Sequence, residues 1–262
     1  MRNLKTDTIV IKIGTSSLTY KNGRIKHKKF DKLARVISDL KNMGKNVVLV
    51  SSGAIAVGVS KLNLEKRPDD VPGRQALAAI GQCALMKLYE SFFSDYGYNV
   101  AQVLMTKYTI EDKRSLNNVK NLFKKLISMN VIPIINENDA IATEEIELGD
   151  NDNLSAHVAE IVGADLLIIL TDIDGFYTEN PAIHPDAKLV GELNEIDDEI
   201  LKRAGGSVSG VGTGGMYTKL IAGKTALTSG ISTIIMNGEE PKMIYDAVDG
   251  KEIGTLIRKA EK

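Results

Sequence analysis

The chain of 262 residues contains a single cysteine, no tryptophan and no marked excess of either charge. The one cysteine, Cys83, cannot form an intrachain disulfide, and its apolar neighbours predict a packed thiol rather than a nucleophile. A net charge of −1 provides no basic field that would favour nucleic acid or an anionic membrane. The sequence also lacks the ~18-residue apolar run that spans a bilayer and a secretory pattern at its N-terminus. These absences predict a cytoplasmic protein that binds neither nucleic acid nor membrane.

Short β-branched runs alternate with longer amphipathic segments along the whole chain. Strands are expected at 8–13, 46–51, 99–105, 131–135, 165–171 and 232–236, and helices near 28–43, 74–94, 113–129, 153–163 and 215–229. Apolar strands separated by helices are typical of an α/β fold, with a mostly parallel sheet covered on both faces. The pair Asn22-Gly23 lies between short polar strands and predicts a hairpin insert. Because no repeat or linker interrupts the chain, we expect one continuous domain, which can still form two lobes around a cleft.

The glycine-rich stretch "SGVGTGGMYTK" has the spacing GxGxxG but not the context of a dinucleotide-binding site. Its three glycines are Gly210, Gly212 and Gly215. That fingerprint follows a strand, whereas the residues before this stretch are polar. What remains is a glycine-rich loop that enters a helix, with Lys219 near the first turn. Such a loop suits a polyphosphate, because it offers backbone amides, a helix dipole and an ammonium group, but it can equally be a flexible surface loop.

A lysine interrupts the first apolar strand, "IVIKIG", close to its C-terminal end. Burying the charge of Lys12 is costly unless a partner or an anion neutralises it. The alternative is a lysine on an edge strand that reaches solvent. Lys12 and Lys219 both lie at junctions between sheet and helix, where ligands of α/β proteins gather. Two such lysines favour transfer of a phosphoryl group, whose negative charge needs cations around it.

The polar stretch "GDNDNLSA" at 149–156 is a calcium loop, a helix cap or one wall of a small-molecule site. An EF-hand loop starting at Asp150 needs glycine and glutamate at positions occupied by Ser155 and Ile161, so the calcium interpretation fails. A cap for the following helix remains a partial explanation. Upstream, Asp139 in "NEND" could accept hydrogen bonds from an ammonium group, or belong to an ordinary Asx-rich turn.

Six segments together resemble the amino acid kinase family, and within it the members that phosphorylate glutamate. These segments are "VIKIGTSSL", "VSSGAIAVG", "INENDAI", "GDNDNLSA", "LTDIDGFYTENP" and "GTGGMYTKL". The resemblance extends over essentially the whole chain. It implies a three-layer α/β/α sandwich with a mostly parallel, eight-stranded open sheet. It also implies that an N-terminal lobe of about 1–160 binds glutamate and a C-terminal lobe of about 161–262 binds ATP.

The resemblance also implies a role for individual residues. Lys12 and Lys219 would stabilise the transition state, and Asp152 would hold both of them in place. Glutamate would be bound by Ser52, Asp139 and Asn151. The residues implied to bind ATP are Lys12, Gly14, Thr171, Asp172, Thr213, Gly214, Gly215, Met216, Tyr217, Thr218 and Lys219.

The implied reaction is ATP- and Mg²⁺-dependent phosphorylation of the γ-carboxylate of L-glutamate, the first step of proline biosynthesis. The resemblance suggests L-proline as a feedback inhibitor, glutamyl phosphate reductase as the next enzyme, and a homo-oligomer, either a dimer or a tetramer. The acidic run Glu144, Glu145 and Glu147 is either a solvated surface or a flap involved in inhibition. Many bacterial members continue into a C-terminal PUA domain, but this sequence ends after "IGTLIRKAEK", so no PUA domain is expected.

The alternatives are sibling kinases for N-acetylglutamate, aspartate, carbamate or UMP, and a non-catalytic sensor of amino acids or nucleotides. A sensor does not need Lys12, Asp152 and Lys219 together, which favours an enzyme. A carboxylate substrate is already ionised at neutral pH and needs no general base. The absence of histidine from all six segments agrees with that chemistry.

Overall fold

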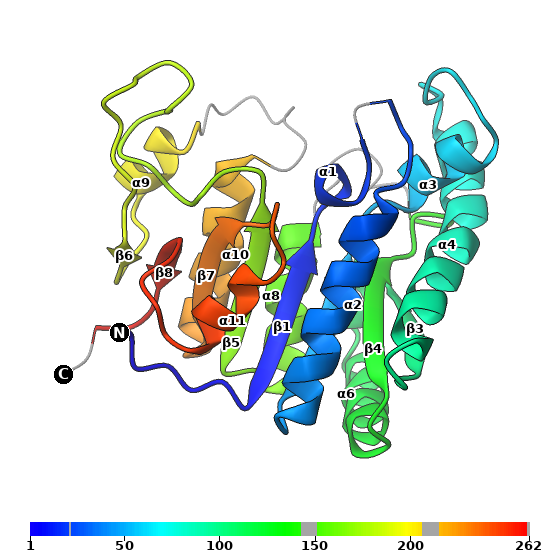
Figure 1. Ribbon diagram of the computed structural model, residues 1–262, viewed down its shortest axis with the longest axis horizontal. Helices are drawn as coiled ribbons and strands as arrows, with labels where there is room; N and C mark the ends of the chain where they lie inside the picture. The colour runs from blue at the N-terminus through cyan, green and yellow to red at the C-terminus, as the bar shows by residue number, and fades with distance from the viewer. Residues whose placement is uncertain (21, 143–150, 206–214, 261–262) are drawn as a thin grey trace.

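The computed structural model describes residues 1–20, 22–142, 151–205 and 215–260. Eight strands in these residues form one sheet with the order β3-β4-β2-β1-β5-β7-β8-β6 (Figure 1). Every neighbouring pair is parallel except β7 and β8, which are antiparallel. The strands are β1 (Thr8–Ile13), β2 (Asn46–Ser51), β3 (Val100–Met105), β4 (Ile132–Glu137), β5 (Leu166–Thr171), β6 (Glu192–Leu193), β7 (Ser232–Asn237) and β8 (Thr255–Ile257). This arrangement confirms the predicted open, mostly parallel sheet.

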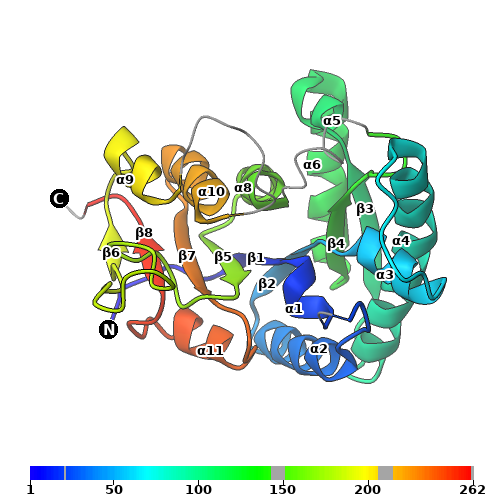
Figure 2. The same cartoon turned by 90° about the horizontal axis from the view of Figure 1, so that it is seen from above.

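Helices cover both faces of the sheet, as the view from above shows (Figure 2). They are α1 (Thr15–Leu18), α2 (His27–Asn42), α3 (Ala54–Lys61), α4 (Val71–Ser94), α5 (Lys107–Glu111), α6 (Lys113–Ser128), α8 (Asn151–Val162), α9 (Asp198–Arg203), α10 (Met216–Thr228) and α11 (Met243–Val248). One core lies between the sheet and α2, α4 and α11, and a second lies between the sheet and α6, α8 and α10. The structure is therefore the predicted three-layer sandwich.

The alternation of side chains along β1 decides where its lysine points. Ile9, Ile11 and Ile13 belong to the core beneath α2, whereas Val10 belongs to the core beneath α8 and α10. Successive residues of a strand face opposite sides of the sheet, so Lys12 shares the side of Val10. The central strand β1 thereby directs a lysine toward the helices α8 and α10.

Several expectations from the sequence need correction. Cys83 is exposed, because it faces outward from α4, and the expected core position is wrong. The helix predicted from 153 begins at Asn151, so Asn151 and Asp152 lie in its first turn.

The hairpin insert is confirmed by an antiparallel bridge between Thr19 and Ile25, with Gly23 at a φ of 79°.

No helix within the described ranges combines the length and apolar character needed to cross a bilayer. The division into a glutamate lobe and an ATP lobe stays a prediction.

Candidate active site

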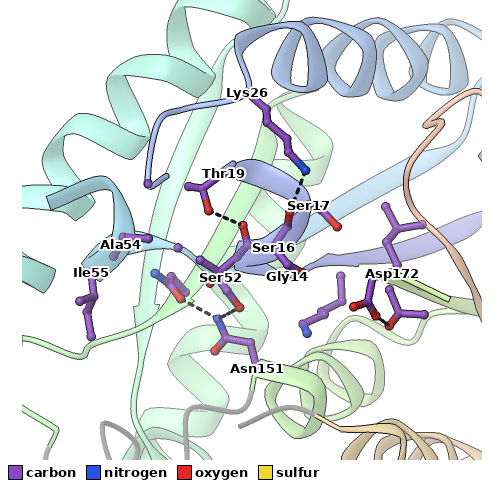
Figure 3. Close-up of a pocket in the computed structure, with 18 of the residues that line it drawn as sticks. Gly14, Ser16, Ser17, Thr19, Lys26, Ser52, Ala54, Ile55, Asn151 and Asp172 are labelled. Carbon is purple, nitrogen blue, oxygen red and sulfur yellow. Dashed lines mark hydrogen bonds between the residues drawn. The ribbon is translucent and has the colours of Figure 1, made fainter. Parts of the chain in front are cut away.

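A cavity of about 930 Å³ opens where β1, β2, β4 and β5 end. Because these strands are parallel, their carboxyl ends meet at one edge of the sheet, and the residues that follow them converge there. Figure 3 shows how some of the lining side chains lie, including Ser52 and Asn151. The predicted site residues that line the cavity are Lys12, Gly14, Ser52, Asp139, Asn151, Thr171, Asp172 and Lys219.

Two lysines from distant parts of the chain flank one buried carboxylate behind this cavity. Nζ of Lys12 lies 2.5 Å from Oδ1 of Asp152, and Nζ of Lys219 lies 3.1 Å from Oδ2 of the same carboxylate. Asp152 is fully buried, and the two lysines are almost so. The alternative of a solvent-facing edge lysine is wrong, because β1 lies between β2 and β5 in the sheet.

The charges of this triad set its ionisation. Burial alone would raise the pKa of Asp152, but the charges of Lys12 and Lys219 outweigh burial and lower that pKa. Asp152 therefore stays ionised at neutral pH. Within the described contacts, two ammonium groups share this single carboxylate, an arrangement that suits the approach of an anion.

The first turn of α10 places Lys219 and supports the buried carboxylate. Thr218 donates its hydroxyl to Oδ2 of Asp152 at 2.9 Å, and the same hydroxyl lies 2.8 Å from the carbonyl oxygen of Gly215. Gly215 is the N-cap and provides no side-chain cap, which is the usual situation where helix N–H groups receive an anion. Met216 and Tyr217 complete this first turn. The predicted ATP-binding residues Thr213 and Gly214, like Gly210 and Gly212, lie outside the described residues.

A network of amides borders the cavity beside the buried triad. The side-chain nitrogen of Asn151 lies 2.8 Å from Oδ1 of Asn136, 3.0 Å from Oγ of Ser52 and 3.1 Å from the carbonyl oxygen of Ser51. Asn136 in turn donates to Oε1 of Gln82 at 2.8 Å. The sequence reasoning missed Asn136 and Gln82. The segment "NEND" contains a signal for the former, but nothing in the helical pattern of α4 marks the latter.

Charged side chains also line the cavity. Asp139 follows β4, and Arg67 comes from the segment between α3 and α4. Burial and the neighbouring Arg74 lower the pKa of Arg67, whereas the nearby carboxylate of Asp139 raises it. Arg67 and Asp139 both line the cavity, so they offer a cation and an anion to a ligand bound there. Arg67 was not among the residues predicted from the sequence.

The loops after β1 and β5 form the remaining wall. Gly14 is the N-cap of α1, and the ammonium group of Lys26 lies 3.0 Å from the carbonyl oxygen of Ser16 within that helix (Figure 3). Thr171 donates its hydroxyl to Oδ1 of Asp172 at 3.1 Å. The structure thus brings part of the predicted phosphate side and the three residues predicted to bind glutamate into one cavity, whereas Gly215 to Thr218 are not among the lining residues.

The sequence model of the amino acid kinase family matches residues 7–237. The chain belongs to the amino acid kinase family. Two similar relatives are glutamate 5-kinases. The protein from Clostridium perfringens (strain 13 / Type A) is 54% identical over 253 residues, which cover 95% of this chain and 94% of that protein. The protein from Enterococcus faecalis (strain ATCC 700802 / V583) is 51% identical over 255 residues, with coverage of 96% and 94%.

Solved structures of amino acid kinase folds resemble the chain over nearly its full length. Carbamate kinase from Giardia lamblia bound to AMP-PNP has a TM-score of 0.69 at 18% identity and covers 97% of this chain and 99% of its own. Isopentenyl phosphate kinase from T. acidophilum in a product complex has a TM-score of 0.62 at 18% identity, with coverage of 96% and 100%. These similarities show the fold of the amino acid kinase family, and they agree with the eight-stranded sheet described above.

Proposed function

We propose that the protein transfers the γ-phosphoryl group of ATP to the γ-carboxylate of L-glutamate, giving L-glutamyl 5-phosphate and ADP. The observation that carries the proposal is the placement of Asn151 and Asp152 at the start of α8. Asn151 lines the cavity, where it would face the acceptor, and the adjacent Asp152 contacts both buried lysines. The glutamate 5-kinases at 54% and 51% identity support this choice of acceptor.

The main electrostatic problem of this reaction is bringing two anions together. A carboxylate must approach a polyphosphate, and the repulsion must be cancelled without water. The ammonium groups of Lys12 and Lys219 would lie where the two anions meet. Because Asp152 fixes both ammonium groups before substrates arrive, little reorganisation is needed when charge develops on the transferred group.

The acceptor side suits an amino acid rather than a simple dicarboxylate. Asp139 would accept hydrogen bonds from the α-ammonium group, and Arg67 would face the α-carboxylate beside it. Ser52 and Asn151 add uncharged polar groups to the lining. This combination of one anion, one cation and neutral donors complements the ammonium and carboxylate groups on the α-carbon of glutamate.

The chemical step needs no general base. An oxygen of the γ-carboxylate, already ionised at neutral pH, attacks the γ-phosphorus of ATP. A new phosphorus–oxygen bond forms, and the bond between the γ-phosphorus and the oxygen bridging it to the β-phosphorus breaks. ADP leaves with that electron pair, and no proton has to move. Lys12 and Lys219 would stabilise the charge on the oxygens of the transferred group.

ATP would lie along the other half of the cavity. The loop beginning at Thr171 and Asp172, the turn at Gly14 and the start of α10 would contact the nucleotide and its phosphates. The part of the chain that the structure describes holds no group of three or more His, Cys, Asp or Glu side chains arranged for a metal ion. Mg²⁺ often binds chiefly to substrate phosphates and retains water, so it would enter with ATP and neutralise charge there.

The remaining biological expectations are also proposals. In this role the protein would catalyse the first step of proline biosynthesis in the cytoplasm, with L-proline as inhibitor and glutamyl phosphate reductase as the next enzyme. A homo-oligomer, either a dimer or a tetramer, is implied by the family resemblance alone. The acidic residues Glu144, Glu145 and Glu147, expected to be either a solvated surface or a flap involved in inhibition, lie outside the described residues.

An acyl-phosphate trap tests the proposal directly. The protein is incubated with ATP, Mg²⁺ and hydroxylamine, and each of glutamate, N-acetylglutamate and aspartate is added separately. ADP release and hydroxamate formation with glutamate are expected, with much lower rates for the other two acids. Turnover of another acid but not of glutamate would assign a sibling activity. No ADP release with any acceptor would favour a sensor.

A further inference from the structure

Gln82 lies outside the wall of the main cavity but ends a chain of hydrogen bonds that reaches it. The residue belongs to α4 and is 8% exposed. Its Oε1 accepts from the side-chain nitrogen of Asn136 at 2.8 Å. The oxygen of Asn136 then accepts from the nitrogen of Asn151 at 2.8 Å, and that nitrogen lies 3.0 Å from Oγ of Ser52. Four side chains from α4, β4, α8 and the end of β2 are thus joined in series.

The chain has one direction, because each amide has a donor end and an acceptor end. Asn136 turns its nitrogen toward Gln82, so its oxygen must face Asn151. Asn151 then presents its nitrogen to Ser52, and the hydroxyl oxygen of Ser52 becomes an acceptor. A hydroxyl that accepts one hydrogen bond still has its own hydrogen to donate. Since Ser52 lines the cavity, that hydrogen is available to a group bound there.

Two backbone groups support the same direction independently of the amide side chains. The backbone N–H of Glu137 donates to Oδ1 of Asn136 at 2.9 Å, which identifies that atom as an oxygen. The carbonyl oxygen of Ser51 lies 3.1 Å from the side-chain nitrogen of Asn151, which identifies that atom as a donor. A backbone N–H can only donate and a backbone carbonyl can only accept. The orientation of both amides therefore follows from the fold.

We propose that Gln82 is a positioning residue for glutamate, acting through Asn136 and Asn151 so that Ser52 donates its hydroxyl hydrogen to a substrate carboxylate. The inference rests on the proposed function. Asn136 is 1% exposed, so its nitrogen cannot turn to water if Gln82 is removed. A buried donor without an acceptor is unfavourable, and any rotation that relieves it breaks the bonds to Asn151 and Glu137.

Matched substitutions at Gln82 and Gln102 test the proposal. Gln102 lines the same small cavity of about 230 Å³ as Gln82, but its side chain takes part in no hydrogen bond within the described residues. Gln82→Met should raise KM for glutamate about tenfold, the factor that follows from losing one hydrogen bond, and leave KM for ATP unchanged. Gln82→Glu keeps an oxygen for Asn136 and should restore most of the affinity, and Gln102→Met should resemble the wild type. Unchanged KM for glutamate in Gln82→Met would overturn the inference.

A double-mutant cycle separates positioning from general damage to the fold. In a Ser52→Ala background the last donor of the chain is absent, so Gln82→Met should add little to KM for glutamate. If the factors by which the two substitutions raise KM for glutamate multiply in the double variant, Gln82 acts by another route, and the proposal would be overturned. If Gln82→Met does not fold, Gln82→Asn, which withdraws the oxygen by one methylene, provides the same comparison. Absence of glutamate phosphorylation by the wild type would instead refute the proposed function.

Discussion

Nζ of Lys12 lies 2.5 Å from a carboxylate oxygen of Asp152, and both side chains are buried beside the cavity. The same carboxylate contacts Lys219, so a single residue of α8 sets the positions of two cations that are 207 positions apart in the sequence, from 12 to 219. Because an unpaired buried charge is unfavourable, the three side chains depend on one another. Loss of any one of them should therefore change both turnover and stability.

Replacing Lys219 with methionine should lower kcat by about two to three orders of magnitude, because charge on the transferred phosphoryl group would lose one cation. Methionine retains much of the volume of the lysine stem, so the packing of α10 should survive. Steady-state kinetics with ATP and glutamate measure the effect, and circular dichroism checks the fold. As a control, Lys224→Met removes an exposed lysine of the same helix and should leave kcat unchanged. Near-wild-type turnover in Lys219→Met would contradict the proposed role.

Asp152→Asn should destabilise the protein by about 3 kcal/mol at neutral pH, because two buried ammonium groups would lose their counterion. The pKa of Asp152 is lowered from its ordinary value of 3.8, so the carboxylate contributes stability that is fully present above that value. This contribution is lost as the pH falls through the lowered pKa. Urea unfolding of the wild type and Asp152→Asn should therefore give a constant difference above about pH 5 and a shrinking one in stronger acid. A difference that grows with acidity would contradict the assigned direction of the shift.

Arg67→Gln should raise KM for glutamate about tenfold with little change in kcat, if Arg67 binds the α-carboxylate, since hydrogen bonds to charged groups contribute about 1.5–3 kcal/mol. The neighbouring exposed lysine gives the control, and Lys66→Gln should leave KM unchanged. Glutamate with an α-carboxamide in place of the α-carboxylate sharpens the comparison. Arg67→Gln should affect the amide much less than glutamate, and equal losses for both acceptors would exclude this contact.

Gly81→Ala should separate α3 from α4 and weaken the acceptor side. A β-carbon at Gly81 would lie 1.8 Å from the carbonyl oxygen of Ala54, a backbone atom that cannot rotate away. We expect a loss of about 1–3 kcal/mol in the free energy of unfolding, the usual cost of overpacking, and a higher KM for glutamate because Ala54 lines the cavity. Gly191→Ala, where no atom lies within 4 Å of the added carbon, should be neutral in both measurements.

The fold could be predicted from the sequence where strands are long and apolar. The six predicted strands correspond to β1 to β5 and β7, whereas β6 and β8 have only two and three residues and no detectable alternation. Cys83 shows the limit of composition, because apolar neighbours in α4 did not reveal which side of the helix faces the core. Short elements and helix orientation depend on packing that a local pattern does not contain.

Residues of the candidate site could be predicted where they differ sharply from their neighbours in the sequence. A lysine in an apolar strand is conspicuous, and Lys12 indeed contacts a buried carboxylate. The identity of that carboxylate came from the family resemblance, since no spacing rule connects 12 to 152. Gln82 and Arg67 escaped notice because polar residues in a helix and a loop are common. Only tertiary structure brings Arg67 to the cavity and places Gln82 behind Asn136, which lines it.

The adjacency of Asn151 and Asp152 has a consequence for how this scaffold could accept other substrates. In the proposed site, Asn151 would lie on the acceptor side, and the adjacent Asp152 contacts the two buried lysines. A single peptide unit of a regular helix would therefore fix the separation of the two half-sites. A residue inserted into or removed from this turn of α8 to suit a longer or shorter acceptor would disturb both half-sites at once. Redesign for a new acceptor should therefore begin at Ser52, Arg67 and Asp139, whose supporting loops can change length while the phosphate geometry is preserved.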